Sequence, residues 1–185
     1  MLLVAACIAM PAPAQTLDVA ELLTLLARVE RSTATFEETR FIAALTVPLV
    51  RRGTLRYVRP DLLEMVVQSP VPERIEIKGD ELTLEARGDV RRLRVSEYPA
   101  IAAWIESVRA TLAGDARTLG RHFRIGARGR LTAWTLELVP IDAELAGFVN
   151  RIAISGTQAQ LTRIEITERG GDHSLMLITA TERRP

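Results

Sequence analysis

The chain has 185 residues, a length that suits one domain with a substantial core. Hydrophobic residues make up 48% of the sequence and aromatic residues only 4%, so the interior is expected to be mostly aliphatic. The 24 basic and 23 acidic side chains leave a formal charge of +1. Arginine clusters at 51–59 and 87–94 follow an alternating strand pattern, and this pattern favours a solvated sheet face over a nucleic-acid surface.

The first fourteen residues are uncharged and either apolar or small. They end in APA at 12–14, the small-x-small form that signal peptidase cleaves, and they are too short to span a membrane. We therefore expect a secretory signal peptide at 1–14, shortened at its start because a charged n-region is missing, and a single domain at 15–185. A second interpretation stays open, because VAAC at 4–7 has the form of a lipobox and would make Cys7 a lipid anchor. Both interpretations predict export to the periplasm.

A helix is expected to open the mature chain. Asp18 and Glu21 form a capping-box pattern, and Leu22, Leu26 and Val29 follow on one face at helical spacing. Alternation of apolar and polar residues then predicts strands joined by tight turns, one of them a hairpin turn at the glycine-rich segment 126–129. The predicted strands are 35–46, 50–58, 62–68, 73–78, 81–86, 90–95, 121–126, 131–139, 148–155, 160–167 and 173–181.

The middle of the chain interrupts the strand pattern. Between 99 and 112 the period becomes helical, Gly114-Asp115 ends this helix, and a short second helical turn is expected before Gly120. The fold class predicted is therefore mainly β with α, an antiparallel sheet of about eleven strands with an N-terminal helix and an inserted lid helix segment. No linker or repeat divides the chain.

Bulky aliphatic residues recur at alternate positions of several predicted strands, and together they would form one concave wall. These residues are Leu63, Met65, Val67, Ile75, Ile77, Ile152, Ile154, Ile164 and Ile166. A large curved sheet closed by few helices favours a cavity for a hydrophobic ligand, and the alternative is an ordinary filled core. Trp104 would be either a core residue or a lid side chain that touches cargo. Met65 would either fill a gap in the core or line a flexible ligand site.

The sequence lacks the usual patterns of an enzyme. His122 and His173 lie far apart with no further His or Cys at metal-ligand spacing, and there is no nucleophile elbow, P-loop or dinucleotide-binding motif. Paired acids such as Glu165 and Glu168 are more often exposed strand carboxylates than catalytic groups. The predicted role is binding, without catalysis, metal or cofactor.

Several motifs resemble the periplasmic lipoprotein-carrier family LolA, in the order in which that family shows them. GTLRYVRP at 53–60 is similar to its G-x-L-x-x-x-R-P strand, and LARV at 26–29 and TFEE at 35–38 look like its first helix and its entry to the sheet. The short apolar strand, the proline-containing turn and the hairpin that follow are LLEM at 62–65, SPVPE at 69–73 and KGDEL at 78–82. The detectable similarity covers roughly Leu22 to Leu84.

The resemblance implies an incomplete barrel with helices over its mouth, which moves acyl chains across the periplasm between an inner-membrane exporter and an outer-membrane acceptor. It also implies that Arg59 latches the sheet to the lid helices, whereas the residue pattern alone indicates an exposed strand-end arginine. The cavity residues expected from the pattern and the resemblance are Leu26, Val29, Phe36, Leu55, Leu63, Met65, Ile101, Trp104, Ile105, Val108 and Trp134.

Departures from the family pattern leave the cargo open. Tyr57 and Met65 stand where the family has strand tryptophans, and the sequence stops at 181–185 without the family's F-x-F-x-x-P-x-G element. A free lipid, a glycolipid or a polyene-type acyl product is as plausible as a lipoprotein. The leading hypothesis is a monomeric carrier of lipid or lipid-modified cargo, and the alternative is a lipid-sensing or partner-binding regulatory domain on the same scaffold.

Overall fold

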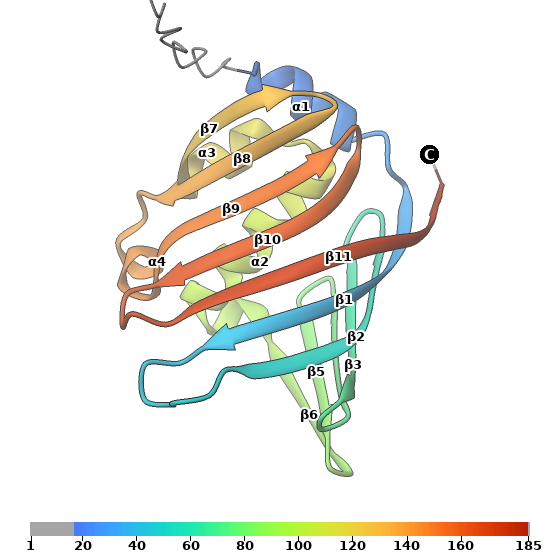
Figure 1. The fold of residues 1–185 in the computed structure, drawn as a ribbon, viewed down its shortest axis with the longest axis vertical. Coiled ribbons are helices and arrows are strands. Elements are labelled where there is room, and N and C mark those ends of the chain that lie inside the picture. Colours follow the sequence, from blue (N-terminus) through green and yellow to red (C-terminus); the bar gives the residue numbers. More distant parts are fainter. Residues whose placement is uncertain (1–16, 185) are drawn as a thin grey trace, which may run out of the picture.

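The computed structural model describes residues 17–184, except for the side chains of 99–101, 180, 181, 183 and 184. The expected signal peptide and Cys7 therefore lie outside the described residues. Eleven antiparallel strands form one strongly curved sheet in the order β6-β5-β4-β3-β2-β1-β11-β10-β9-β8-β7 (Figure 1). The two edge strands, β6 and β7, do not pair with each other, so the barrel stays open. This architecture confirms the predicted fold class.

The strands match the expected pattern closely. They are β1 (Arg31–Phe41), β2 (Leu49–Val58), β3 (Leu62–Ser69), β4 (Glu73–Lys78), β5 (Glu81–Ala86), β6 (Asp89–Arg94), β7 (Phe123–Arg130), β8 (Ala133–Pro140), β9 (Val149–Thr157), β10 (Gln160–Glu168) and β11 (His173–Arg184). Among the described residues, the one large crossover joins β6 to β7 through the helical insertion. β1 and β11 pair at the centre of the sheet, so the two ends of the domain meet there.

Helix α1 (Val19–Leu26) begins where the capping pattern predicts. The Asp18 carboxylate accepts a hydrogen bond from the Ala20 amide at 2.8 Å, and Leu22, Leu23 and Leu26 are buried. The insertion holds a 3-10 turn, η1 (Val95–Glu97), and two helices, α2 (Pro99–Ala113) and α3 (Ala116–His122). Gly114 ends α2 in the left-handed conformation, with φ at +72°.

Three local predictions are wrong. β1 begins at Arg31 and ends at Phe41, and residues 42–48 form a loop. The predicted strand extended into this loop because the apolar residues continue there. The segment 126–129 lies inside β7, because its backbone pairs in regular register with β8 and the turn falls at 131–132 instead. A short helix, α4 (Ala143–Phe148), was not predicted, although the Asp142 carboxylate caps it by accepting from two backbone amides at 3.0 Å.

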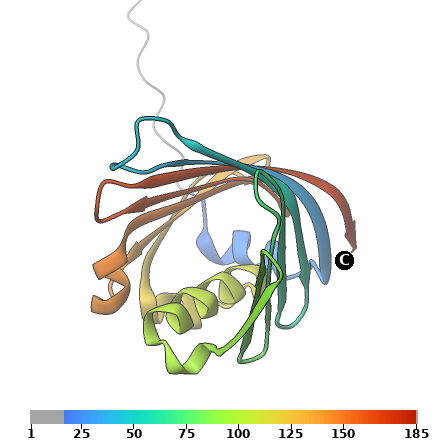
Figure 2. The same ribbon diagram turned by 90° about the horizontal axis from the view of Figure 1, so that it is seen from below.

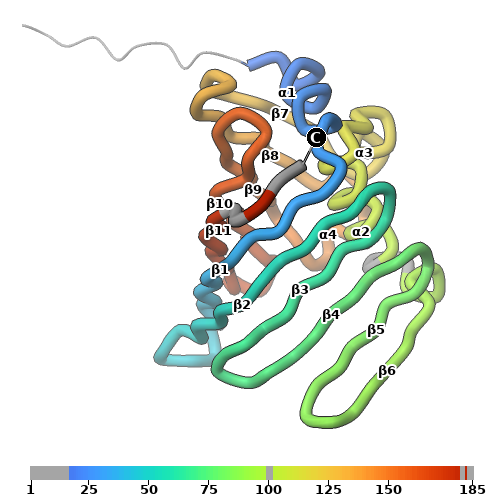
Figure 3. Tube along the Cα trace, turned by 90° about the vertical axis from the view of Figure 1, so that its right-hand side faces the viewer, coloured from blue at the N-terminus to red at the C-terminus, as the bar shows by residue number. Residues whose placement is uncertain are grey.

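The interior is divided between a filled half and a hollow half. α1, α3 and α4 pack on β7, β8 and β9 through a core that includes Leu22, Leu119, Trp134 and Leu136. α2 crosses the open side of the sheet and packs on β4 and β5 through Ile105, Ile77 and Leu82 (Figure 2). The hairpins from β2 to β6 form the wall that faces α2 (Figure 3). The candidate site lies between this wall and helices α1 and α2.

Candidate hydrophobic cavity

A cavity of about 480 Å3 lies between the concave face of the sheet and helices α1 and α2. Its volume is within the range of small-molecule pockets, about 300–1,000 Å3. The lining is overwhelmingly aliphatic, because each strand turns its alternate apolar residues inward. β3, β4 and β5 contribute Leu63, Met65, Ile75, Ile77, Leu82 and Leu84, and the opposite wall contributes Ile152, Ile154, Ile164, Ile166, Met176 and Ile178.

Most of the predicted cavity residues lie together on this lining. They are Leu26, Val29, Leu55, Leu63, Met65, Trp104, Ile105 and Val108. The side chain of Ile101 lies outside the described residues. Two predicted residues, Phe36 and Trp134, lie in filled parts of the core instead, and the packing around each explains why.

Phe36 forms the floor at one end of the cavity. Along β1 and β2 the inward pairs run from Ala34 and Leu55, which line the cavity, to Phe36 opposite Gly53. Phe36 packs with Val67 and Met176, and a Cβ on Gly53 would lie only 3.0 Å from its ring and 1.9 Å from the Val66 carbonyl oxygen. Because Gly53 has no side chain, the phenyl ring of Phe36 has room to pack across this end of the cavity and close it.

An ion pair closes the sheet beyond this floor. Glu38 and Arg51 are the next inward pair in the register, and the Arg51 guanidinium donates two hydrogen bonds to the Glu38 carboxylate, the one from Nε at 2.8 Å. Glu38 is only 7% exposed. A buried carboxylate keeps its charge at low cost only with such a partner, so the pair marks where the apolar lining stops.

Trp134 belongs to the filled half of the interior. Its side chain is 2% exposed within the core that α1 and α3 cover, and its indole Nε1 donates to the Gln158 carbonyl at 2.8 Å. A Cβ on Gly156 would lie 2.3 Å from the ring, so the glycine is needed for close approach of β9 to this indole. The sequence analysis expected Trp134 to line the cavity, and strand periodicity alone does not show which half of the inward face is filled.

Trp104 lies at the boundary between the cavity and solvent. It lines the cavity from α2 and is 36% exposed, whereas its neighbour Ile105 is buried against β4 and β5. The indole therefore has the position of a lid side chain, one of the two interpretations that the sequence left open.

Two arginines tie the helices to the rim of the sheet, at the turn between β2 and β3 and at the turn between β4 and β5. Arg59 donates from Nη1 to the carbonyl of Ala27, which follows the last residue of α1. Arg109 on α2 donates from Nη2 to the carbonyls of Asp61 at 3.0 Å and Gly79 at 2.7 Å. Arg59 thus contacts α1, not the inserted helix, and the contact that holds α2 comes from Arg109.

Sequence reasoning missed Arg109 and Tyr57. Arg109 follows Ile105 by four positions and Val108 by one. A charged residue next to the apolar stripe of α2 was therefore the sequence signal that could have identified it. The Tyr57 side chain is 5% exposed on the cavity wall, and its hydroxyl is buried with no hydrogen-bond partner among the described residues. Burial raises the pKa of Tyr57 above its usual value of 10.0, against a smaller opposing effect of the Arg59 charge.

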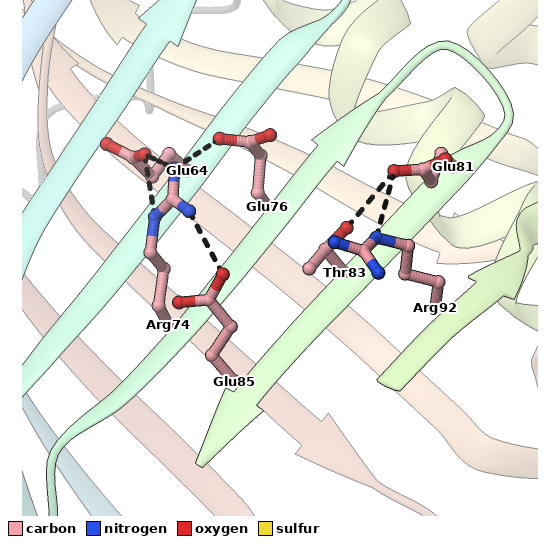
Figure 4. A network of polar contacts seen from close by, with 7 residues as sticks. All are labelled: Glu64, Arg74, Glu76, Glu81, Thr83, Glu85 and Arg92. Carbon is pink, nitrogen blue, oxygen red and sulfur yellow. Dashed lines mark hydrogen bonds and ion pairs between the residues drawn. The ribbon is translucent and has the colours of Figure 1, made fainter. Parts of the chain in front are cut away.

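The outer face of the same wall is charged. Arg74 on β4 contacts Glu64 at 2.7 Å and Glu85 at 3.3 Å, and it also contacts Glu76 (Figure 4). The hydrogen bond that the Arg74 guanidinium donates to the Glu64 carboxylate is the main reason that the pKa of Arg74 is raised. These residues alternate with the cavity-lining aliphatics on the same strands, so one side of the sheet faces water and the other faces the cavity.

Neither a metal cluster nor a membrane-spanning helix appears in the part of the chain that the structure describes. Among those residues, no three His, Cys, Asp or Glu side chains are grouped to hold a metal ion. None of the described helices combines the length and the hydropathy that crossing a bilayer requires.

Comparison with known proteins identifies the family. Solved structures with similar folds include a LolA superfamily protein from Nitrosomonas europaea (11% identity, TM-score 0.47, covering 90% of this chain and 92% of that one). Another is the lipoprotein LppX of Mycobacterium tuberculosis (14% identity, TM-score 0.43, covering 87% and 91%). None of the curated proteins matches. The model of one family, described as "outer membrane lipoprotein carrier protein LolA-like", matches residues 11–184, and the chain therefore belongs to this family of carrier proteins.

Proposed function

We propose that this protein is a periplasmic carrier, which holds a lipid or lipid-modified cargo in the cavity and moves it from the inner membrane toward the outer membrane. The observation that carries the proposal is an aliphatic cavity of about 480 Å3 under two helices. Burial of each methylene contributes about 0.8 kcal/mol, so an acyl chain gains affinity throughout such a lining. Membership of a carrier family supports the same role.

The cargo is proposed to enter by displacement of α2. Trp104 and Val108 line the cavity from this helix, and α2 packs on β4 and β5 mainly through the small cluster around Ile105. Arg109 adds two polar contacts at the rim. α2 also packs on the main core through Ala103 and Ala110 and contacts α1, α3 and α4. Opening therefore moves side-chain contacts of the helical layer, while the backbone ladder of the strands beneath it stays paired.

The first experiment identifies what the cavity holds. Native mass spectrometry of the protein purified from its own periplasm should show a bound mass, and its fragmentation gives the class of lipid. Transfer of this lipid to acceptor vesicles distinguishes a carrier from a lipid sensor, because a sensor binds without passing its ligand on. A cavity that stays empty in the purified protein and in added acyl lipid would overturn the proposal.

A second experiment tests the wall directly. Affinity for fatty acids should rise about fourfold for each added methylene until the cavity is full. Met65→Trp fills part of the cavity and should lower the chain length at which this rise stops. Val66→Trp, one residue along on the opposite face of β3, is the matched control and should leave the series unchanged.

A further inference from the structure

The largest group of exposed apolar side chains lies at the end of the sheet beyond the Glu38–Arg51 pair. The segment FIAALTVPLV at 41–50 contains no charged residue, and all of it except Ile42 is exposed. Val47 is 70% exposed, and Phe41, Leu45, Leu49 and Val50 are also exposed. We call residues 41–50 the apolar tip. Monomeric proteins seldom expose such contiguous apolar surface without a binding role.

The fold holds this tip in a defined position. The Ala43 amide donates to the Asp172 carboxylate at 2.8 Å, and the Leu45 amide donates to the Ile42 carbonyl at 2.8 Å. The Phe41 ring stacks on His173 with centroids 4.3 Å apart. The exposed side chains are therefore presented by an ordered loop and are not the by-product of an unstructured one.

A second apolar element lies at the same end. The turn between β10 and β11 binds the tip through Asp172 and binds α4 through Arg169, whose Nε donates to the Ala146 carbonyl at 2.6 Å. α4 ends in Phe148, which is 63% exposed, and Ile141 just before the helix is exposed too. Figures 1 and 2 both show the loop and α4 on one side of the molecule.

The charges around the tip are already neutralised. Each arginine that flanks it in the sequence pairs with a carboxylate of the sheet: Arg40 with Glu168 at 3.6 Å, Arg51 with Glu38, and Arg52 with Glu37 at 2.7 Å. Asp172 and Arg169 of the neighbouring turn add one charge of each sign and bind backbone groups. A collar with little net charge around an uncharged tip suits a zwitterionic lipid surface better than a strongly charged partner. Because the arginines are occupied, attraction to anionic lipid is not the driving force.

The shape of the surface also favours a lipid surface over a protein. A stable protein interface buries about 800 Å2 per partner with a complementary surface. A protruding loop needs no complementary surface when it enters the fluid boundary of a bilayer. We infer that the apolar tip is a membrane-docking element, which inserts into the surface of a lipid bilayer with the paired arginines at the headgroup level.

The test measures whether the tip enters lipid. In the full chain, Cys7→Ser removes the single cysteine, and Val47→Cys or Val90→Cys then places an environment-sensitive fluorophore on the tip or on β6. Val90 is the matched control, because it is a valine of comparable exposure (51%) on a different strand pair. With phosphatidylcholine vesicles, the emission of the label at position 47 should shift to the blue and be quenched by brominated acyl chains. The label at position 90 should not change.

Two further measurements separate insertion from other kinds of adsorption. Added salt should not reduce the signal from position 47, because the collar carries little net charge. Leu45→Asp with Leu49→Asp should reduce the vesicle-bound fraction of labelled tip at least about tenfold, since two apolar side chains no longer gain from burial. A label at position 47 that stays in water, or labels at both positions that respond equally, would overturn the inference. The result does not depend on whether the cavity holds lipid.

Discussion

Arg109 provides the sharpest test of how the cavity is closed. Its guanidinium is the polar contact between α2 and two turns of the sheet rim, at Asp61 and Gly79. Arg109→Met keeps the length and the apolar stem of the side chain but removes both hydrogen bonds. We expect α2 to open more often while the sheet and α1 stay as they are, because α1 is held separately through Arg59.

The size of the effect follows from the contacts. Two hydrogen bonds from a charged donor stabilise the closed helix by about 3 kcal/mol at about 1.5 kcal/mol each. The Arg109 Nε is buried with no hydrogen-bond partner in the part of the chain that the structure describes, and its removal returns about 1 kcal/mol. The net loss of about 2 kcal/mol corresponds to about a thirtyfold increase in the open population.

Hydrogen exchange measured by mass spectrometry reports this opening directly. Amides of α2 should exchange about thirtyfold faster in the Arg109→Met variant, and amides of β1 and β11 at their wild-type rates. Arg117→Met is the matched control, because Arg117 is exposed on the neighbouring helix α3. Unchanged exchange in α2, or equally faster exchange throughout the sheet, would refute the view that Arg109 holds a lid.

Three further changes test other parts of the structure. Arg51→Met leaves the buried carboxylate of Glu38 without its partner, so the free energy of unfolding measured in urea should fall by about 3 kcal/mol; a loss below about 1 kcal/mol would mean that water reaches the pair. The amide and hydroxyl of Ser96 donate to the Asp80 carboxylate and lower its pKa below 3.8, so the stabilisation is present above that pH and lost as pH falls through the folded pKa. Asp80→Asn should therefore lower Tm at pH 7 but not at an acid pH below the folded pKa of Asp80, and a pH-independent difference would contradict this. Gly156→Ala should destabilise by about 1–3 kcal/mol because its Cβ would overlap the indole on β8, and a neutral thermal melt would show that the strands can separate there.

The strand pattern could be predicted because alternation is a local property of the sequence. In β3, Leu63, Met65 and Val67 turn to one face whatever covers them. The same rule failed in the apolar tip, where consecutive apolar residues continued after the last paired residue of β1. There the chain leaves the sheet, and no local signal distinguishes an exposed apolar loop from a buried strand.

The cavity itself could be predicted only in part, because its limits depend on which helix covers which strand. Leu26 and Trp134 both carry the inward pattern, yet Leu26 borders the cavity and Trp134 lies in the core beneath α1 and α3. Phe36 becomes floor because Gly53 on the neighbouring strand makes room for it. Such packing is fixed by strand register and by helix placement, and neither the sequence pattern nor the family resemblance indicated it.

The two ends of the sheet impose different requirements on any cargo that passes through. An acyl chain that moved along the concave face toward the apolar tip would have to pass Phe36 and separate the Glu38–Arg51 pair, which would leave the buried Glu38 carboxylate without its partner. The floor therefore blocks that route, whereas exchange through the side that α2 covers leaves the Glu38–Arg51 pair and the strands in place. Because α4 packs against α2 and is bound to the same turn as the tip, docking of the tip would bring this movable helix close to the bilayer surface. The tip would then position the protein, and α2 would admit the cargo.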